Sequence, residues 1–454
     1  MDIRVRNRNS MITAADGGSF LLPFILVTSL FFLWGFAHSL LDVLNKHFQS
    51  ILGVSKAQSG LVQAAVYGGY FLMALPAGLF IKRFGYKRGI LLGLFLYAAG
   101  ALLFYPATQI REFWAFLTAL FIIALGLTCL ETAANPYTMV LGPPERAAQR
   151  INLAQSFNGL GWVIGPIAGS LILFATASGE NVFASLAIPY VGIGIVVLLV
   201  ALLFFITKLP DINEALQQPD ENPIAEVTGD RESYRSLLHY PYFIFAVMAQ
   251  FFYVAAQTGI NSFFINYVTE IFHGIENRKM IGESFLTNII QAVNNLKSGI
   301  PDQENLFNTT AGLMLSFSFG LFMAGRFTGS MLLTWFKPNR LLLVYSILCL
   351  LLTMLVITGT GVVGIISLGL IYFFMSIMFP TIFALGLRGL GSHTRKASSF
   401  IVMAIVGGAV FTPLMGYIAD QYSMRIGFTV PLVCFAAVFF FAIRGYKIKE
   451  WKFN

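Results

Sequence analysis

The stretch Cys129-Leu130-Glu131-Thr132-Ala133-Ala134-Asn135-Pro136-Tyr137 places a carboxylate deep inside an apolar run that extends from about Trp114 to Leu141. A second carboxylate, Asp42, lies inside the apolar run of about residues 21–47. A carboxylate at membrane depth costs about 2.5–3.5 kcal/mol on insertion scales, so it is rarely retained without a use. The usual uses are a proton relay, an ion site or a substrate contact. The alternative is a carboxylate that lies near a helix end and is simply solvated.

The composition indicates a membrane protein with many spans. Of the 454 residues, 57% are hydrophobic and 11% are charged, whereas about 25% are charged in a typical soluble domain. The sequence therefore predicts an all-α membrane protein with twelve transmembrane helices. The twelve apolar runs of spanning length cover about residues 21–47, 59–81, 89–107, 113–141, 152–178, 183–207, 240–271, 309–336, 340–359, 361–387, 398–420 and 427–444.

The basic residues predict the topology. With the N-terminus inside, 22 of the 29 Lys and Arg residues fall on the cytoplasmic side, as the positive-inside rule requires when both termini are cytoplasmic. The net charge of +8 is then a topology signal, and we expect the lipid bilayer as a partner and no nucleic acid. The expected segments are a cytoplasmic tail at 1–20, six helices at 21–207, a cytoplasmic linker at 208–239, six helices at 240–444 with a periplasmic insertion at 272–308, and a cytoplasmic tail at 445–454.

The two halves repeat weakly. The segment from Asn135 to Gly142 ends the fourth run, and the segment from Phe379 to Gly386 ends the tenth with the same Pro-to-Gly spacing. Such a repeat around a cytoplasmic linker predicts two pseudo-symmetric six-helix bundles around a central cavity. Within the insertion, five apolar residues recur at helical spacing and predict an amphipathic helix on the outer surface. They are Ile281, Phe285, Ile289, Val293 and Leu296.

Polar residues inside the runs form rows at helical spacing. Neutral amides both donate and accept hydrogen bonds, as an uncharged polar ligand requires, and an aromatic plane suits the C–H face of such a ligand, a role that competes with ordinary packing. The row on the first run is His38, Asp42 and Asn45. The others are Glu131 and Asn135 on the fourth, Asn152, Gln155 and Asn158 on the fifth, and Gln257 and Asn261 on the seventh, with Trp34, Trp162 and Tyr253 as candidate aromatic planes.

Several motifs resemble known families. The turn Gly78 to Arg88 is similar to the loop signature of the major facilitator superfamily, although its usual Asp is Lys82 here. A stronger resemblance, to the L-fucose:proton symporter (fucose permease) family, extends from Phe32 to Asp420. The motifs that carry it are Trp34-Gly35, Asp42, Cys129 to Pro136, Asn152 to Asn158, Ala256-Gln257-Thr258, Gly325 to Gly329, Phe379 to Phe383 and Ser398 to Met403.

This resemblance implies a bacterial inner-membrane sugar:proton symporter, with Asp42 at the proton-exchange position and Glu131 as the cavity carboxylate. Fucose permease has an Asn-Asn pair where this chain has His38-Ser39. The family also contains glucose, galactose and N-acetylglucosamine transporters, so the sugar stays open, as does sodium as the coupling ion. His38 either assists proton movement, since its unperturbed pKa lies near physiological pH, or is a hydrogen-bonded cavity histidine, the interpretation we favour.

We therefore expect proton-coupled monosaccharide uptake by alternating access, in a protein that acts as a monomer. The alternative within the superfamily is a proton-coupled exporter of lipophilic compounds, which the Gly-Pro stretch from Gly159 to Gly169 favours and the polar rows oppose. A sugar sensor of the same fold would need a long signalling tail, and few residues follow Arg444. No catalytic, metal-binding or phosphate-loop constellation is visible, so neither an enzyme nor a metal or cofactor is expected. Cys129, Cys349 and Cys434 do not suggest a disulfide framework.

Overall fold

A computed structural model of the chain describes residues 12, 19–143, 147–174, 182–207, 240–277, 283–296, 300, 302–359, 361–388, 390 and 394–447. Within these residues, twelve helices are long and apolar enough to cross a membrane, by length and composition. They correspond in order to the twelve expected spans, so the predicted all-α fold with twelve spans is confirmed. The expected linker at 208–239 and most of both expected tails lie outside the described residues.

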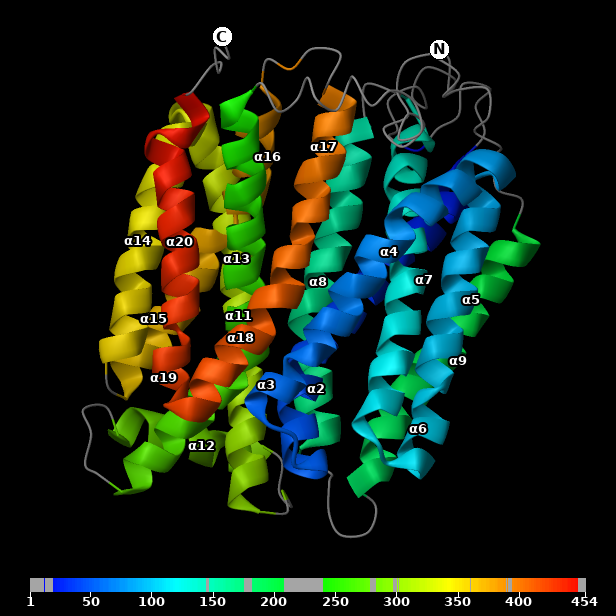
Figure 1. The fold of residues 1–454 in the computed structure, drawn as a ribbon. Helices are drawn as coiled ribbons and strands as arrows, with labels where there is room; N and C mark the ends of the chain where they lie inside the picture. The colour runs from blue at the N-terminus through cyan, green and yellow to red at the C-terminus, as the bar shows by residue number, and fades with distance from the viewer. Residues whose placement is uncertain are drawn as a thin grey trace, which may run out of the picture. The chain divides into compact units, whose positions relative to one another are not determined.

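The first six spans, drawn from blue to green in Figure 1, begin and end within a few residues of the apolar runs. The third span is interrupted at Leu103, and the second is preceded by one helical turn. The elements are α2 (Leu21–Leu52), α3 (Lys56–Ser59), α4 (Leu61–Phe84), α5 (Tyr86–Leu102), α6 (Phe104–Ile110), α7 (Phe113–Val140), α8 (Ala147–Leu173) and α9 (Val182–Ile206).

The last six spans include two that are built from shorter pieces. The tenth is divided between two helices near Ser376, and a short 3-10 turn interrupts the eleventh. The elements are α11 (Pro241–Asn277), α12 (Glu283–Leu296), α13 (Gln303–Trp335), α14 (Pro338–Thr358), α15 (Val362–Met375), α16 (Met378–Leu387), α17 (Thr394–Met403), η5 (Ala404–Val406), α18 (Gly407–Gln421), α19 (Met424–Gly427), α20 (Thr429–Ile443) and η6 (Gly445–Lys447). The helix α12 confirms the helix predicted inside the insertion.

The chain forms two compact units, and their boundary passes through α2, α4, α8 and the first turn of α9. Unit 1 comprises Met1–Ser39, Gly69–Gly165 and Leu186–Ala225. Unit 2 comprises Leu40–Gly68, Pro166–Ser185 and Glu226–Asn454. This division differs from the two halves at 21–207 and 240–444, which stay a prediction.

In unit 1, glycines bring α5 and α7 into close contact. A Cβ on Gly93 would lie 2.9 Å from the backbone oxygen of Gly126, so the two backbones approach as closely as small residues allow. Basic side chains then stabilise two helix ends in this unit, as expected for cations near carbonyls that lack an intrahelical partner. Lys87 Nζ donates to the backbone oxygens of Phe205 (3.1 Å) and Thr207 (2.8 Å) at the end of α9. The fully buried Arg150 likewise donates to the backbone oxygen of Thr138 in α7, at 3.1 Å.

Candidate functional site

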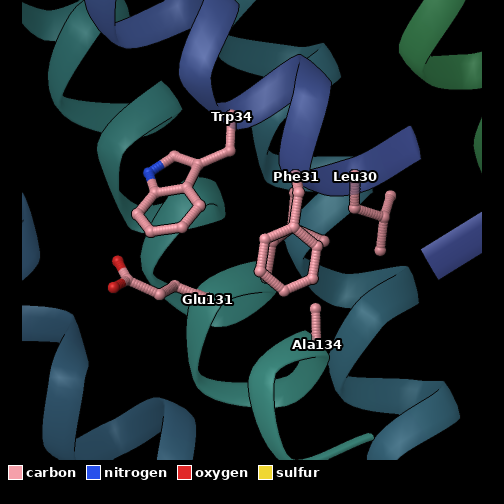
Figure 2. Close-up of a pocket in the computed structure, with 6 residues that line it drawn as sticks. Leu30, Phe31, Trp34, Glu131 and Ala134 are labelled. Atoms are coloured by element: carbon pink, nitrogen blue, oxygen red, sulfur yellow. The ribbon is translucent and has the colours of Figure 1, made fainter. Parts of the chain in front are cut away.

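A small pocket in unit 1 lies between α2 and α7, at the two motifs that stood out in the sequence. Figure 2 shows the Glu131 carboxylate below the indole of Trp34, with the ring of Phe31 to their right. The indole N–H of Trp34 has no hydrogen-bond partner among the described residues, although it is buried. A buried donor without a partner is costly, so the pocket offers both a donor and a carboxylate acceptor to a ligand. Its lining residues are Leu30, Phe31, Trp34, Leu130, Glu131 and Ala134.

His38 lies at the centre of an aromatic group in the same unit. Its Nε2 is 2.8 Å from the hydroxyl of Tyr70 on α4. Its ring stacks on Trp162 of α8 at 5.8 Å between centroids and meets Trp34 edge-on at 6.1 Å. The structure thus brings together three of the candidate residues, Trp34, His38 and Trp162, and the bond to Tyr70 agrees with the interpretation of His38 as a hydrogen-bonded histidine.

The polar residues of α7 and α8 contact each other within unit 1. The amide of Gln155 donates to Asn135 Oδ1 at 3.4 Å, and the amide of Asn135 donates to the backbone oxygen of Glu131 at 3.1 Å. Asn158 is buried, and its amide donates to the backbone oxygen of Phe31 at 3.0 Å. Asn158 therefore also holds α8 against α2, a structural role that the sequence did not indicate.

Asp42 belongs to unit 2, where it is 3% exposed. The amide of Gln63, on α4, donates to Asp42 Oδ1 at 3.1 Å. The fully buried Tyr372 of α15 lies near the Asp42 carboxylate. The Tyr372 hydroxyl has no hydrogen-bond partner among the described residues. Asp42 is therefore not solvated at a helix end, which was the alternative interpretation of this residue.

The other predicted residues of unit 2 lie on α2 and α11. Asn45 is fully buried, and its amide donates to the backbone oxygen of Ser262 on α11 at 3.0 Å. Asn261 is 5% exposed, and its Oδ1 has no partner within the described residues. Gln257 is partly exposed one turn earlier on α11. A free amide oxygen and a partly exposed amide on one helix face suit a ligand that both donates and accepts hydrogen bonds.

The donor set suits a neutral polar ligand better than a metal ion. Across the described residues, no group of three or more His, Cys, Asp and Glu side chains could hold a metal. Each cysteine is buried and free. The candidate residues of unit 1 include amides, two indoles and the Glu131 carboxylate, and those of unit 2 include amides and the Asp42 carboxylate. They provide neutral hydrogen-bonding groups, ring faces, and carboxylates that can change their charge.

Sequence reasoning missed Tyr70 and Gln63, which are the partners of His38 and Asp42. Both were visible as polar groups inside the second apolar run. Nothing in one sequence shows, however, which face of α4 turns towards α2. A search for buried polar residues on the span next to each candidate would have found both.

Comparisons with known proteins give one consistent family. A model of the Major Facilitator Superfamily matches residues 24–407. The L-fucose-proton symporter of Escherichia coli (strain K12) is 38% identical, over 94% of each chain. The glucose/galactose transporter of Brucella abortus biovar 1 (strain 9-941) is 34% identical, over 93% of each chain.

Solved structures of transporters are also similar to this chain. A crystal structure of a Major Facilitator Superfamily transporter, FucP, in the outward conformation is 38% identical, covers 93% of this chain and 98% of that chain, and gives a TM-score of 0.63. The inward open conformation of the xylose transporter XylE from E. coli is 12% identical, covers 95% of this chain and 96% of that chain, and shares the fold with a TM-score of 0.65. Fold, motifs and relatives agree, and the chain belongs to the L-fucose-proton symporter family of the Major Facilitator Superfamily.

Proposed function

We propose that this chain carries a monosaccharide together with protons into a bacterial cell, across the inner membrane. The observation that carries the proposal is the pocket lined by Trp34 and Glu131, which combines a buried donor without a partner among the described residues with a carboxylate. The relatives named above are a fucose-proton symporter and a glucose/galactose transporter. The substrate class is therefore a hexose or a deoxyhexose, held by neutral amides and indole rings.

The two carboxylates have different roles in this proposal. Glu131, Trp34, Asn135, Gln155, Asn158 and Trp162 contact the sugar, with His38 positioned by Tyr70. Asp42 takes up and releases the proton. Neutral Asp42 lets the loaded carrier turn over, because no unpaired charge then moves through low dielectric. Asn45, Gln257 and Asn261 are the remaining residues that we propose contact the sugar.

The proposed topology follows from the basic residues. Both termini and the linker at 208–239 are cytoplasmic, and 272–308 faces the periplasm. The halves at 21–207 and 240–444 rock against each other, so that the sugar site is open to one side of the membrane at a time, as in transporters built from repeats. The working unit is one chain.

The test is uptake of labelled hexoses into right-side-out vesicles that carry either a proton or a sodium gradient, followed by competition with unlabelled L-fucose, glucose and galactose. We expect accumulation with the proton gradient alone and displacement by at least one of the three sugars. Accumulation that requires sodium would contradict the coupling ion. Energised efflux of lipophilic dyes without any sugar uptake would instead favour the exporter.

A further inference from the structure

Asp420, at the end of α18, makes an unusual contact with the start of the second span. Its two carboxylate oxygens accept hydrogen bonds from the backbone N–H groups of Lys56 (3.0 Å) and Ala57 (2.8 Å). Lys56 Nζ in turn donates to the backbone oxygen of Ala419 at 3.4 Å. Both partners belong to unit 2, and Figure 1 shows α3 beside the lower end of α18. A carboxylate from the eleventh span thus caps the helix that leads into the second.

The backbones at this contact leave no room for side chains. A Cβ on Gly60 would lie 2.8 Å from both Cα and N of Pro413, and a Cβ on Gly416 would collide with the backbone oxygen of Lys56. Glycine on both sides is a close-packing device between helices. The two segments are therefore closely packed, and the two hydrogen bonds of Asp420 add to this contact.

At the start of the second span, Asp420 provides the hydrogen-bond acceptors for two backbone N–H groups. The first N–H groups of a helix have no intrahelical partner. Ser55 Oγ accepts from the N–H of Gln58 at 3.1 Å, so the local chain satisfies that group itself. The N–H groups of Lys56 and Ala57 are satisfied by Asp420. If α18 moved away, water would have to replace the carboxylate.

The same segment carries the proposed proton site. Asp42 and Gln63 lie within 40–68, the part of the first two spans that belongs to unit 2. Between Asp42 and this end of the molecule, Gln49 and Asn266 of α11 form a reciprocal amide pair, with the Asn266 amide 2.5 Å from Gln49 Oε1 and the Gln49 amide 3.4 Å from Asn266 Oδ1. In this arrangement Asp42 is 3% exposed.

We propose that Asp420 is a latch that holds the outer end of the transporter closed over Asp42, and that its release from Lys56 and Ala57 is part of the opening to the outside. The word "outer" rests on the proposed topology. Exposed carboxylate caps compete with water, so losing two charge-assisted hydrogen bonds should raise the open fraction by about ten-fold.

Cysteine labelling tests the latch. Ser262 of α11 is fully buried and lies beside the Asp42 carboxylate, so the small change Ser262→Cys reports opening of the path to Asp42. It is introduced after Cys129, Cys349 and Cys434 have been replaced by Ala. An impermeant maleimide is added to right-side-out vesicles. We expect Asp420→Ala to label about ten-fold faster than the parent, with Asp420→Asn between them because it keeps one acceptor oxygen.

Glu270 provides the matched control. Its Oε2 accepts from the N–H of Met424 at 3.0 Å, so it caps α19 in the same way, but both partners belong to the last six spans. Glu270→Gln should label at the parent rate. Equal rates in the parent and both Asp420 variants, or an equal increase in Glu270→Gln, would overturn the latch. Faster labelling of the Asp420 variants only in inside-out vesicles would support the latch and overturn the proposed topology.

Discussion

The amide of Gln63 donates to Asp42 Oδ1 at 3.1 Å, and both side chains are buried in the same unit. A donor aimed at a carboxylate favours its charged form, so Gln63 opposes protonation of Asp42. This bond joins the first span to the second, with a sequence separation of 21. Gln63 is therefore positioned to set the pH range in which Asp42, as the proposed coupling residue, exchanges a proton.

The first prediction is that Gln63→Leu moves the pH dependence of uptake towards alkaline values. Without the donor, protonated Asp42 persists to a higher external pH. A hydrogen bond to a charged group contributes about 1.5–3 kcal/mol, so the external pH of half-maximal uptake should rise by roughly one to two units. Initial rates of labelled sugar uptake across a pH series provide the measurement.

A buried glutamine elsewhere provides the control for Gln63. Both amide atoms of Gln250, on α11, lack a partner within the described residues, and the side chain is fully buried. Gln250→Leu should therefore leave the pH profile unchanged. An identical profile in Gln63→Leu and the parent would show that this bond does not tune Asp42.

The sequence predicted the spans because a membrane helix is encoded locally, in about twenty consecutive apolar residues. It also predicted the row of His38, Asp42 and Asn45, because α2 is one unbroken helix from Leu21 to Leu52. The pairing of His38 with Tyr70 could not be predicted. It depends on how α4 is rotated about its own axis, and that rotation is set by packing against neighbours that are distant in the sequence.

The structural role of Asn158 could not be predicted for the same reason, since it also depends on packing between helices that are distant in the sequence. Its position on α8 marked it as a sugar contact, and nothing local showed that its amide would reach the backbone oxygen of Phe31. Gly35 allows this reach, because a Cβ there would collide with the backbone oxygen of Asn158. A close approach of two helices through a glycine is a tertiary property. The sequence indicates the small residue but not its partner.

The second prediction concerns the indole N–H of Trp34. Trp34→Phe keeps an aromatic ring and removes the donor, so sugar affinity should fall about five-fold, as expected for roughly 1 kcal/mol of net hydrogen bonding. Isothermal titration calorimetry on the purified protein measures the change. Trp114 is 59% exposed, and Trp114→Phe should bind as the parent does. Equal affinities in all three proteins would remove the Trp34 N–H from the sugar site.

The third prediction separates Gln155 from Asn158. Gln155→Ala should weaken sugar binding by about five- to 150-fold, since a lost buried partner costs about 1–3 kcal/mol. Asn158→Ala should weaken binding and also lower the thermal unfolding temperature, because it breaks the bond to Phe31 that joins α8 to α2. Calorimetry and thermal unfolding in detergent measure the two effects.

Ser156→Ala is the control for this pair, because Ser156 Oγ donates within its own helix, to the backbone oxygen of Asn152 at 2.9 Å. It should change neither quantity beyond a few tenths of a kcal/mol. Unaltered sugar affinity in both Gln155→Ala and Asn158→Ala, with folding intact, would exclude α8 from the sugar site.

The last prediction separates the two carboxylates. Asp42→Asn is a permanent mimic of the protonated form, so it should lose sugar accumulation driven by a pH gradient but keep exchange of labelled for unlabelled sugar. Glu131→Gln keeps the shape of the pocket around Trp34 but removes a charged acceptor, so it should weaken sugar binding and therefore slow exchange as well. Both variants are reconstituted in liposomes and assayed for exchange and for gradient-driven uptake. If Asp42→Asn still accumulates sugar against its gradient when only protons can drive it, Asp42 is not the coupling residue.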